Sequence, residues 1–388
     1  MKIKLGDICT FQSGGTPTKG TEEFFNGTIP WITTTALNGG KIDGTQAVNW
    51  ITEKAIEKSA AKLVPAFSIM VGTRVGVGKV AVNTVQMSTS QDIISLINID
   101  ENRWDKDYLC KYIQGKNAFL NSQARGATIK GIKMDVLANL ELEEIPLIEQ
   151  VRISETIDKV KEILDARKRE LLELDKLVKA RFAELFGNPV LNDKGWEQKI
   201  LAAIASKIGS GATPKGGKEA YRENGIALVR SMNVHNGRFE YKDLAHISDE
   251  QAGKLDNVTL EENDVLLNIT GASVARSCVA PSEILPARVN QHVCIIRCKE
   301  CIVPEFLNKL FINDNYQVLL RRMAGAGATR EAITKQQVES LHIIMPPLEI
   351  QQRFADFVVQ TGKSKAAVQK SLDETQVLFD SLMQKYFG

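Results

Sequence analysis

The sequence predicts a mixed α/β (α+β) protein built as a tandem repeat, in which each repeat is a globular domain followed by a long helix. Residues 152–187 and 353–388 carry one helical pattern, and each copy ends in Phe-Gly. Both copies follow a Pro-Leu step, at Pro146 and Pro347, which suits the first turn of a helix. Self-similarity at a fixed period is the signature of repeat architecture. The expected parts are globular domains at 1–145 and 188–346 and long helices at 146–187 and 347–388.

The repeat extends through the globular domains. Residues 13–17 read Ser-Gly-Gly-Thr-Pro and residues 210–214 read Ser-Gly-Ala-Thr-Pro. The apolar run at 69–71 matches the run at 265–267, and both have the composition of a buried strand. Further matched steps are Gln91 with Gln291, and Gly-Ala-Thr at 126–128 with Gly-Ala-Thr at 327–329. Because the matches are collinear, we expect the two domains to share one fold.

Apolar residues recur at alternating steps of three and four along both long segments, which is the spacing of a heptad seam. The seam residues are Ile153, Ile157, Val160, Leu164, Leu171, Leu174, Val178 and Leu185 in the first helix and Phe354, Val358, Val368, Leu372, Phe379, Leu382 and Tyr386 in the second. Polar residues interrupt the seam at Arg167, Arg181, Thr361 and Lys365. Gly187, followed by Pro189, ends the first helix. We expect the two helices to pair antiparallel as a stiff spacer of about 57 Å.

Composition sets broad limits. The chain of 388 residues is 43% apolar and 25% charged, as in an ordinary globular protein. The net charge is only +2, so any binding of nucleic acid must come from local basic patches. No apolar stretch approaches the ~18 residues that span a bilayer, and the first residues lack the apolar core of a signal peptide. We therefore expect a cytosolic (cytoplasmic) protein without a membrane partner.

Two motifs invite a metal or nucleotide interpretation, and neither is complete. Cys298 and Cys301 have ligand spacing, but no second pair and no nearby histidine supplies four ligands. We expect Cys294, Cys298 and Cys301 to be small buried hydrophobic residues and predict no metal site. The loop at 211–218 resembles a phosphate-binding loop, yet Ala212 replaces the first glycine and Glu219 follows the lysine. We expect a phosphate-positioning loop or a simple turn there.

No catalytic constellation is present in the sequence. The Asn/Asp-Pro-Pro-Tyr/Phe signature of an adenine methyltransferase is absent, because residues 345–348 read Met-Pro-Pro-Leu. The four histidines do not cluster with metal-ligand spacing, and no serine lies in a Gly-x-Ser-x-Gly elbow. We therefore predict a protein that is not an enzyme.

The ordered set of motifs, present twice, resembles the specificity subunits of Type I restriction-modification systems along the whole chain. The resemblance rests on Leu-Gly-Asp-Ile at 5–8, the two Ser-Gly-x-Thr-Pro loops, Pro-Trp-Ile at 30–32, the Gln91 and Gln291 steps, the Gly-Ala-Thr segments, and Pro-Leu-x-x-Gln-x-Arg at 146–152 and 347–353. Two departures are small. Ala202-Ala203 stands where the first repeat has Gly-Asp, and Leu228 stands where it has Trp31.

The resemblance implies two target recognition domains held apart by an antiparallel coiled coil, and a bipartite, asymmetric DNA target. It implies no catalysis and no cofactor on this chain. Two methyltransferase subunits would dock on it and bring S-adenosylmethionine, and two motor-endonuclease subunits could join. Two alternatives stay open: the specificity subunit of a methylation-only complex, and a coiled-coil adaptor that binds proteins without reading DNA.

Comparison of the repeats suggests where DNA would be read. Glycines and apolar residues repeat, whereas the polar residues beside them differ, as in the segments 33–38 and 230–236. Exposed Arg, Asn, Gln, Ser and Thr match the donor and acceptor pattern of base edges, so differing sets predict differing half-sites. The candidates in the first domain are Lys19, Thr33, Thr34, Thr35, Asn38, Arg74, Lys79, Gln91, Arg125 and Lys130. Those in the second are Lys215, Lys218, Arg230, Ser231, Asn233, Asn236, Arg276, Asn290, Gln291, Arg322 and Arg330.

Some of these assignments have an ordinary alternative. Arg230 fits a base contact and a plain surface charge equally well, because phosphate contacts outnumber base contacts in such interfaces. Gln91 and Gln291 could instead satisfy buried backbone groups. Further basic candidates are Lys133, Arg288, Arg321 and Lys335.

Overall fold

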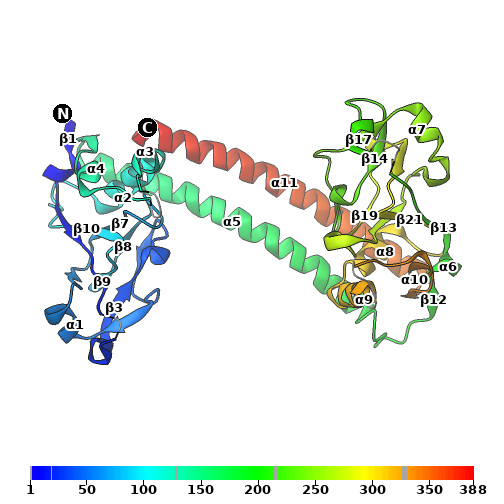
Figure 1. Cartoon of the computed structure of the whole chain (residues 1–388), viewed down its shortest axis with the longest axis horizontal. Helices are drawn as coiled ribbons and strands as arrows, with labels where there is room; N and C mark the ends of the chain where they lie inside the picture. The colour runs from blue at the N-terminus through cyan, green and yellow to red at the C-terminus, as the bar shows by residue number, and fades with distance from the viewer. Residues whose placement is uncertain (1, 19, 127–129, 214–216, 326–330) are drawn as a thin grey trace. The chain divides into compact units, whose positions relative to one another are not determined.

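The computed structural model describes residues 2–18, 20–126, 130–213, 217–325 and 331–388, and it divides into two compact units. Unit 1 comprises Met1–Lys168 and Lys370–Gly388, and unit 2 comprises Arg169–Gln369. The boundary falls inside the two long helices, α5 (Leu147–Phe186) and α11 (Leu348–Phe387). Each unit therefore holds one globular domain and one end of each long helix (Figure 1). The long helices form where the sequence predicts them.

The described residues of unit 1 form three sheets. Their strand orders are β2-β10-β7-β8-β4, β5-β3-β9-β6 and β1-β11. The strands are β1 (Lys2–Lys4), β2 (Thr10–Ser13), β3 (Phe25–Ile32), β4 (Lys41–Ile42), β5 (Asn49–Ile51), β6 (Leu63–Val64), β7 (Ile69–Gly72), β8 (Val80–Asn83), β9 (Met87–Thr89), β10 (Ile93–Ile97) and β11 (Glu141–Glu143). The short helices are α1 (Glu53–Lys58), α2 (Lys106–Gly115), α3 (Asn117–Gln123) and α4 (Met134–Ala138).

Unit 2 repeats this plan with small changes. Its strand orders are β13-β21-β18-β19, β17-β14-β20, β12-β22 and the hairpin β15-β16. The strands are β12 (Gln198–Ile200), β13 (Ala205–Ser210), β14 (Ile226–Val229), β15 (Val234–His235), β16 (Arg238–Phe239), β17 (Ala245–Ile247), β18 (Val265–Asn268), β19 (Ser277–Val279), β20 (Ala287–Val289), β21 (Val293–Cys298) and β22 (His342–Ile344). The short helices are α6 (Leu201–Ile204), α7 (Asp249–Gly253), α8 (Pro304–Phe311), α9 (Asp314–Gly325) and α10 (Lys335–Glu339).

Strand pairing confirms the duplication. In unit 1, β7 lies between β10 and β8, and in unit 2 its counterpart β18 lies between β21 and β19, all antiparallel. These central strands are the two apolar runs that the sequence matched. The second sheets also agree, because Ile32 of β3 pairs in parallel with Thr89 of β9, as Val229 of β14 pairs with Val289 of β20. Two pairings differ among the described residues: the counterpart of β4 in unit 2 is β16, which pairs with β15, and the counterpart of β6 is an isolated bridge between Thr259 and Arg288.

The core of each unit is completed by the far end of the other repeat's helix. In unit 1, Phe387 at the end of α11 is 2% exposed, and its ring centroid lies 5.3 Å from that of Tyr108 in α2. In unit 2, Phe186 at the end of α5 is 0% exposed and lies 4.7 Å from Phe306 in α8. The phenylalanines of the Phe-Gly endings in the two repeats thus have the same packing role.

The two long helices run antiparallel within each unit. The start of α5 and the end of α11 share the core of unit 1, whereas the end of α5 and the start of α11 share the core of unit 2. The heptad prediction is confirmed for the buried residues Ile153, Ile157, Val160 and Leu164. Lys365, which interrupts the apolar seam, forms an ion pair with Asp175 on the facing helix.

A buried glutamine fixes the start of each long helix. Gln150 and Gln351 are both 0% exposed. The Oε1 atom of Gln150 accepts a hydrogen bond from the Asp105 backbone N–H at 2.9 Å, and Gln351 accepts one from Val303 at 3.0 Å. Asp105 and Val303 precede α2 and α8, so each glutamine ties a long helix to the helix that receives the Phe-Gly end. This explains the glutamine in both Pro-Leu-x-x-Gln segments.

The cysteine prediction is confirmed only in part. Cys294 is buried, Cys298 is half-buried, and Cys301 is exposed. The prediction is wrong for Cys301 because this residue lies in the turn after β21, beyond the strand whose inner face buries Cys294. Burial raises the pKa of Cys294 and Cys298 to about 12, so these thiols stay protonated near neutral pH.

Among the helices in the described residues, none has the length and apolar content needed to cross a membrane.

Replacing Gln351 by alanine tests the role of the buried glutamines. The Val303 N–H would lose its acceptor inside the core, so we expect Gln351→Ala to cost about 1–3 kcal/mol of unfolding free energy. The adjacent Gln352 is exposed, and Gln352→Ala should change stability by no more than about 0.5 kcal/mol. Thermal and urea unfolding would measure both. Equal midpoints for the two variants would contradict this role.

Candidate nucleic-acid interface

In unit 1, the predicted loops gather at one end of the sheets. In the antiparallel sheet this end carries the residues that follow β2 and β7 and those that precede β10 and β8. In the second sheet, β3 and β9 are parallel, so the residues after both strands also emerge together. The backbone N–H of Ser90 donates to Ile32 at 2.9 Å, and that of Gly15 donates to Thr89 at 2.9 Å, which joins the two sheets at this end.

We define loop cluster 1 as the segments 14–18, 33–38, 73–79, 90–92, 125–126 and 130–131. Its segments are hydrogen-bonded to one another. The Thr73 N–H donates to the Asp92 carbonyl at 2.8 Å, and the Ile132 N–H donates to the Thr73 carbonyl at 2.8 Å. Arg125 and Gly131 form a reciprocal bridge. Backbone bonds therefore hold segments that lie far apart in the sequence in one surface.

Loop cluster 2 comprises the segments 211–213, 230–236, 269–276, 290–292 and 331–333 of unit 2. The same connections recur. The Asn290 N–H donates to Val229 at 3.0 Å, as Ser90 does to Ile32, and the Ile269 N–H donates to His292 at 3.0 Å, as Thr73 does to Asp92. The Ile333 N–H donates to Ile269 at 2.8 Å, as Ile132 does to Thr73 in unit 1. The two clusters are thus one scaffold built twice.

The glycines of the Ser-Gly-x-Thr-Pro loops allow close packing of backbone against backbone. A Cβ atom at Gly14 would lie 2.2 Å from the Ser90 carbonyl oxygen, and one at Gly211 would lie 1.8 Å from that of Val289. Both distances are far below contact distance, so any side chain would separate the loop from the strand beside it. These glycines therefore build the surface and are not available for close approach to a ligand.

Most candidates of the first domain lie on the surface of loop cluster 1. Thr35, Asn38, Arg74, Lys79, Gln91, Arg125 and Lys130 are exposed, Thr33 is half-buried, and Thr34 is buried. Arg74 lies 3.8 Å from Asp92, a carboxylate within the same cluster. The side chain of Asn38 accepts a hydrogen bond from the Gly40 N–H at 2.9 Å, which stabilises its own turn. Lys19 lies outside the described residues.

The candidates of the second domain are more varied. Asn236, Gln291 and Arg322 are exposed, Arg230, Ser231 and Arg276 are half-buried, and Asn233 and Asn290 are buried. Arg322 lies on the last turn of α9 and outside loop cluster 2 as defined. Lys215, Arg330 and the side chain of Lys218 fall outside the described part of the chain.

Arg230 is held in place by its own unit. Its guanidinium donates to the Asp243 carbonyl and lies 5.1 Å from the centroid of the Tyr221 ring. Its Nε atom is buried and has no hydrogen-bond partner among the described residues. Arg230 is therefore neither a free surface charge nor fully satisfied by the protein.

Several polar candidates face the interior. Asn233 is 0% exposed, accepts a hydrogen bond from the Arg230 N–H at 3.1 Å and donates to the Glu240 carbonyl at 2.9 Å, so it stabilises its turn. Asn290 is 5% exposed and accepts from the His292 N–H at 3.0 Å. Arg288, expected on the basic surface, is buried and forms a 2.7 Å ion pair with Asp256. A short amide can replace a backbone partner in a turn, and the residue type alone does not separate this role from recognition.

His292 is a member of loop cluster 2 that the sequence analysis did not select. Its Nδ1 atom lies 2.5 Å from the Thr270 hydroxyl, and its Nε2 atom lies 3.1 Å from the Gln291 amide. The matched residue of unit 1 is Asp92, since both follow the repeated glutamine. A carboxylate and an imidazole at one scaffold position offer different hydrogen-bonding groups. This difference was visible in the sequence, one residue after the selected glutamines.

Metal chemistry finds no support in the described part of the chain, where no group of three or more His, Cys, Asp or Glu side chains could hold an ion. Both loop clusters instead present amides, hydroxyls and guanidinium or ammonium groups. Such groups form hydrogen bonds with base edges and ion pairs with phosphates.

The chain is similar to a known protein family and to several characterised proteins. The family model of the Type I restriction modification DNA specificity domain matches residues 1–175 and 193–374. The MjaIX specificity subunit of Methanocaldococcus jannaschii is 26% identical over 98% of this chain and 91% of that protein. The EcoR124I/EcoR124II specificity subunit of Escherichia coli is 31% identical over 40% of this chain and 39% of that protein.

Two solved structures share the fold. The crystal structure of a Type-I restriction-modification S subunit from M. genitalium has a TM-score of 0.61 and 15% identity, covering 100% of this chain and 96% of that one. A chain from a structure of complex assembly and conformational transition in the type I R-M system has a TM-score of 0.64 and 18% identity, covering 100% and 97%. Each of the two segments matched by the family model lies within one repeat, and the chain belongs to the DNA specificity subunits of Type I restriction-modification systems.

Proposed function

We propose that this chain reads a bipartite, asymmetric DNA sequence, with each loop cluster contacting one half-site. The observation that supports this most strongly is the combination of one scaffold with two sets of side chains. Thr33 and Arg230 follow the matched strands β3 and β14, and Asp92 and His292 precede the matched strands β10 and β21. Because the backbones agree while the hydrogen-bonding groups differ, the two clusters would prefer different bases.

Local charge supports contact with the phosphate backbone. Arg74, Lys79, Arg125 and Lys130 are exposed in loop cluster 1, and Arg276 is half-buried in loop cluster 2. The chain as a whole carries a net charge of only +2, so these local cations would dominate attraction to DNA. Phosphate contacts would fix register, and the amides and hydroxyls would read sequence.

We propose that the long helices act as the spacer and as the docking surface for two methyltransferase subunits. Each helix has 40 residues, about 60 Å at the rise of an α-helix, and each begins in one unit and ends in the other. In this proposal the chain performs no catalysis. The methyltransferase subunits bring S-adenosylmethionine, and two motor-endonuclease subunits complete a restricting complex. Without them the same chain would serve a methylation-only complex.

Selection from a random duplex pool tests the proposal. The chain, purified with its cognate methyltransferase subunits, should enrich two unlike half-sites separated by a constant gap. Its affinity should fall steeply between 50 and about 200 mM salt, because DNA binding releases counterions. A pool that stays random after selection, or binding that is indifferent to salt, would favour a protein-only adaptor.

Two glutamine variants test the assignment of one cluster to each half-site. Gln91 and Gln291 are exposed and occupy matched positions. We expect Gln91→Ala to cost about 1–3 kcal/mol of binding free energy through one half-site only, and Gln291→Ala to do the same through the other. Fluorescence anisotropy with duplexes that keep one intact half-site would measure this. The control is Gln376→Ala, at an exposed glutamine of α11. Uniform weakening on every sequence would reassign both glutamines to phosphate contacts.

Shortening the helices tests the spacer. One heptad would be removed from each helix at the level of the Asp175–Lys365 ion pair, which keeps the seam in register. The gap between half-sites should shrink by about 10 Å, or about three base pairs. Replacing the same heptads with heptads of different sequence and equal length serves as the control. A gap that stays constant after the deletion would show that another part of the complex sets it.

A further inference from the structure

A chain of hydrogen bonds in loop cluster 2 holds both ends of the Gln291 amide. The Nε2 atom of Gln291 lies 3.1 Å from the Nε2 atom of His292, and its Oε1 atom is hydrogen-bonded to the Thr213 hydroxyl. On its other side the His292 ring is hydrogen-bonded through Nδ1 to the Thr270 hydroxyl, at 2.5 Å. Gln291 is nevertheless exposed. Ordering a long exposed side chain costs conformational entropy, so an amide fixed at both ends needs a reason beyond packing.

The backbone of His292 is itself fixed by the scaffold of unit 2. Its N–H donates to the side-chain oxygen of Asn290 at 3.0 Å, and Asn290 is only 5% exposed. Its carbonyl accepts from the N–H of Ile269, a core residue, at 3.0 Å. The imidazole is therefore anchored independently of Gln291 and can orient the amide beside it.

The direction of each hydrogen bond follows from the amide nitrogen of Gln291, which can only donate. The Nε2 atom of His292 must then accept, so the ring carries its proton on Nδ1 and donates it to the Thr270 hydroxyl. At the other end, Oε1 accepts from the Thr213 hydroxyl. A primary amide has two N–H groups and two acceptor sites on its oxygen. One of each is engaged, and one donor and one acceptor remain side by side.

This remaining pair matches one base. In the major groove adenine presents the N7 acceptor next to the N6 amino donor, and a glutamine amide can bond to both. Guanine presents two acceptors, N7 and O6, so a fixed Oε1 atom would face the O6 atom of guanine. An amide that can turn over offers its donor and acceptor in either order. Fixing the amide of Gln291 therefore adds discrimination that the residue type alone does not supply.

The same two scaffold positions touch in unit 1, but with different chemistry. Arg74 and Asp92 stand at the positions of Thr270 and His292, and the Arg74 guanidinium lies 3.8 Å from the Asp92 carboxylate. A guanidinium only donates and a carboxylate only accepts, so these two groups satisfy each other. Among the described residues, hydrogen bonds at both ends of the amide are found for the glutamine of unit 2 and not for Gln91.

We infer that His292 is a positioning residue that orients Gln291 to read an adenine in the half-site of unit 2. The inference rests on the proposed function, in which loop cluster 2 contacts one half-site. His292 acts through Gln291 and does not touch the DNA, because both of its ring nitrogens are already engaged. Gln91 reads the other half-site with an amide that is free to turn.

Base analogues test this inference in the complex of the chain with its methyltransferase subunits. Each adenine in the half-site affected by Gln291→Ala is replaced in turn by 7-deazaadenine, which lacks N7, or by purine, which lacks the N6 amino group. At one adenine, both analogues should weaken binding by the wild-type chain about tenfold. With His292→Ala the natural duplex and both analogues should bind equally, because the two changes remove one shared interaction. Undiminished sensitivity of His292→Ala to the analogues would overturn the inference.

Two larger substitutions separate orientation from space filling. His292→Gln supplies an acceptor of similar reach and should recover the adenine preference. His292→Lys can only donate, so it should attract Oε1, turn the amide over and lose the preference. The readout is the ratio of affinities for the adenine and 7-deazaadenine duplexes, which a general loss of stability does not change. If both variants keep the preference, or both lose it, His292 has no orienting role.

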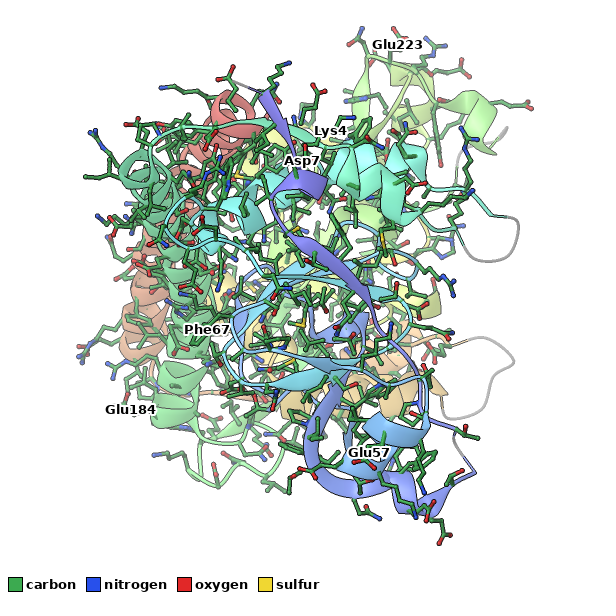
Figure 2. All side chains as sticks on the ribbon, turned by 90° about the vertical axis from the view of Figure 1, so that its left-hand side faces the viewer. Lys4, Asp7, Glu57, Phe67, Glu184 and Glu223 are labelled. Atoms are coloured by element: carbon green, nitrogen blue, oxygen red, sulfur yellow. The ribbon has the colours of Figure 1, made fainter. Side chains whose placement is uncertain are left out.

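Glu223→Gln controls for the charge that lysine adds. Glu223 is an exposed residue of unit 2 whose side chain projects from the surface (Figure 2). It precedes β14, whereas loop cluster 2 begins after the other end of that strand. The substitution raises the net charge by the same amount as His292→Lys and should leave the adenine preference intact. Loss of the preference in this control as well would assign the lysine effect to charge and overturn the inference.

The outcomes also distinguish this inference from the proposed function. A wild-type complex that enriches no sequence from a random pool would defeat the proposed function. A complex that enriches two half-sites, with no adenine sensitive to both analogues in the half-site of unit 2, would leave the proposed function standing and overturn the role of His292.

Discussion

The structure depends on one packing arrangement: the aromatic end of each long helix enters the core of the domain that belongs to the other repeat. Phe387 packs against Tyr108 and Tyr112 in unit 1, and Phe186 packs against Phe306 and Phe354 in unit 2. Buried aromatic residues contribute large apolar areas, so neither domain has a complete core from its own repeat. Gln150 and Gln351 then fix the helices that leave the same cores. These few side chains therefore connect the loop clusters, the long helices and the stability of each core.

The sequence was informative where periodicity and repetition carry the signal. The two repeats, the buried seam at Ile153 and Ile157, and the matched central strands are confirmed because each reflects a local spacing that the other repeat duplicates. The predicted domain limits follow the sequence repeats, whereas the compact units cut through both long helices. That difference arises from contacts between residues far apart in the chain, such as Tyr108 with Phe387, which no local pattern reveals.

Side-chain direction was the main limit at the candidate interface. Thr34, Asn233 and Asn290 have the composition of recognition residues, yet they are buried and the two asparagines hold turns. For Cys301 the error has the opposite sign. Cysteine is usually buried, yet Cys301 lies in an exposed turn. In each case, burial of the side chain depends on where the residue lies relative to the end of a strand. A difference of one position along the chain can change a buried side chain into an exposed one. The assignment of individual exposed residues to bases or phosphates stays a prediction.

The exchange of helix ends has a consequence for how such proteins can arise. Each repeat contains one receiving core and one inserting helix, so two separate polypeptides, each with a single repeat, could satisfy every one of these contacts by mutual insertion. Two identical copies would then form a two-fold symmetric homodimer. Its paired surfaces would be equal and would suit a palindromic site. Fusion of two such copies into one chain would free each half to diverge, and the side chains of loop clusters 1 and 2 do differ.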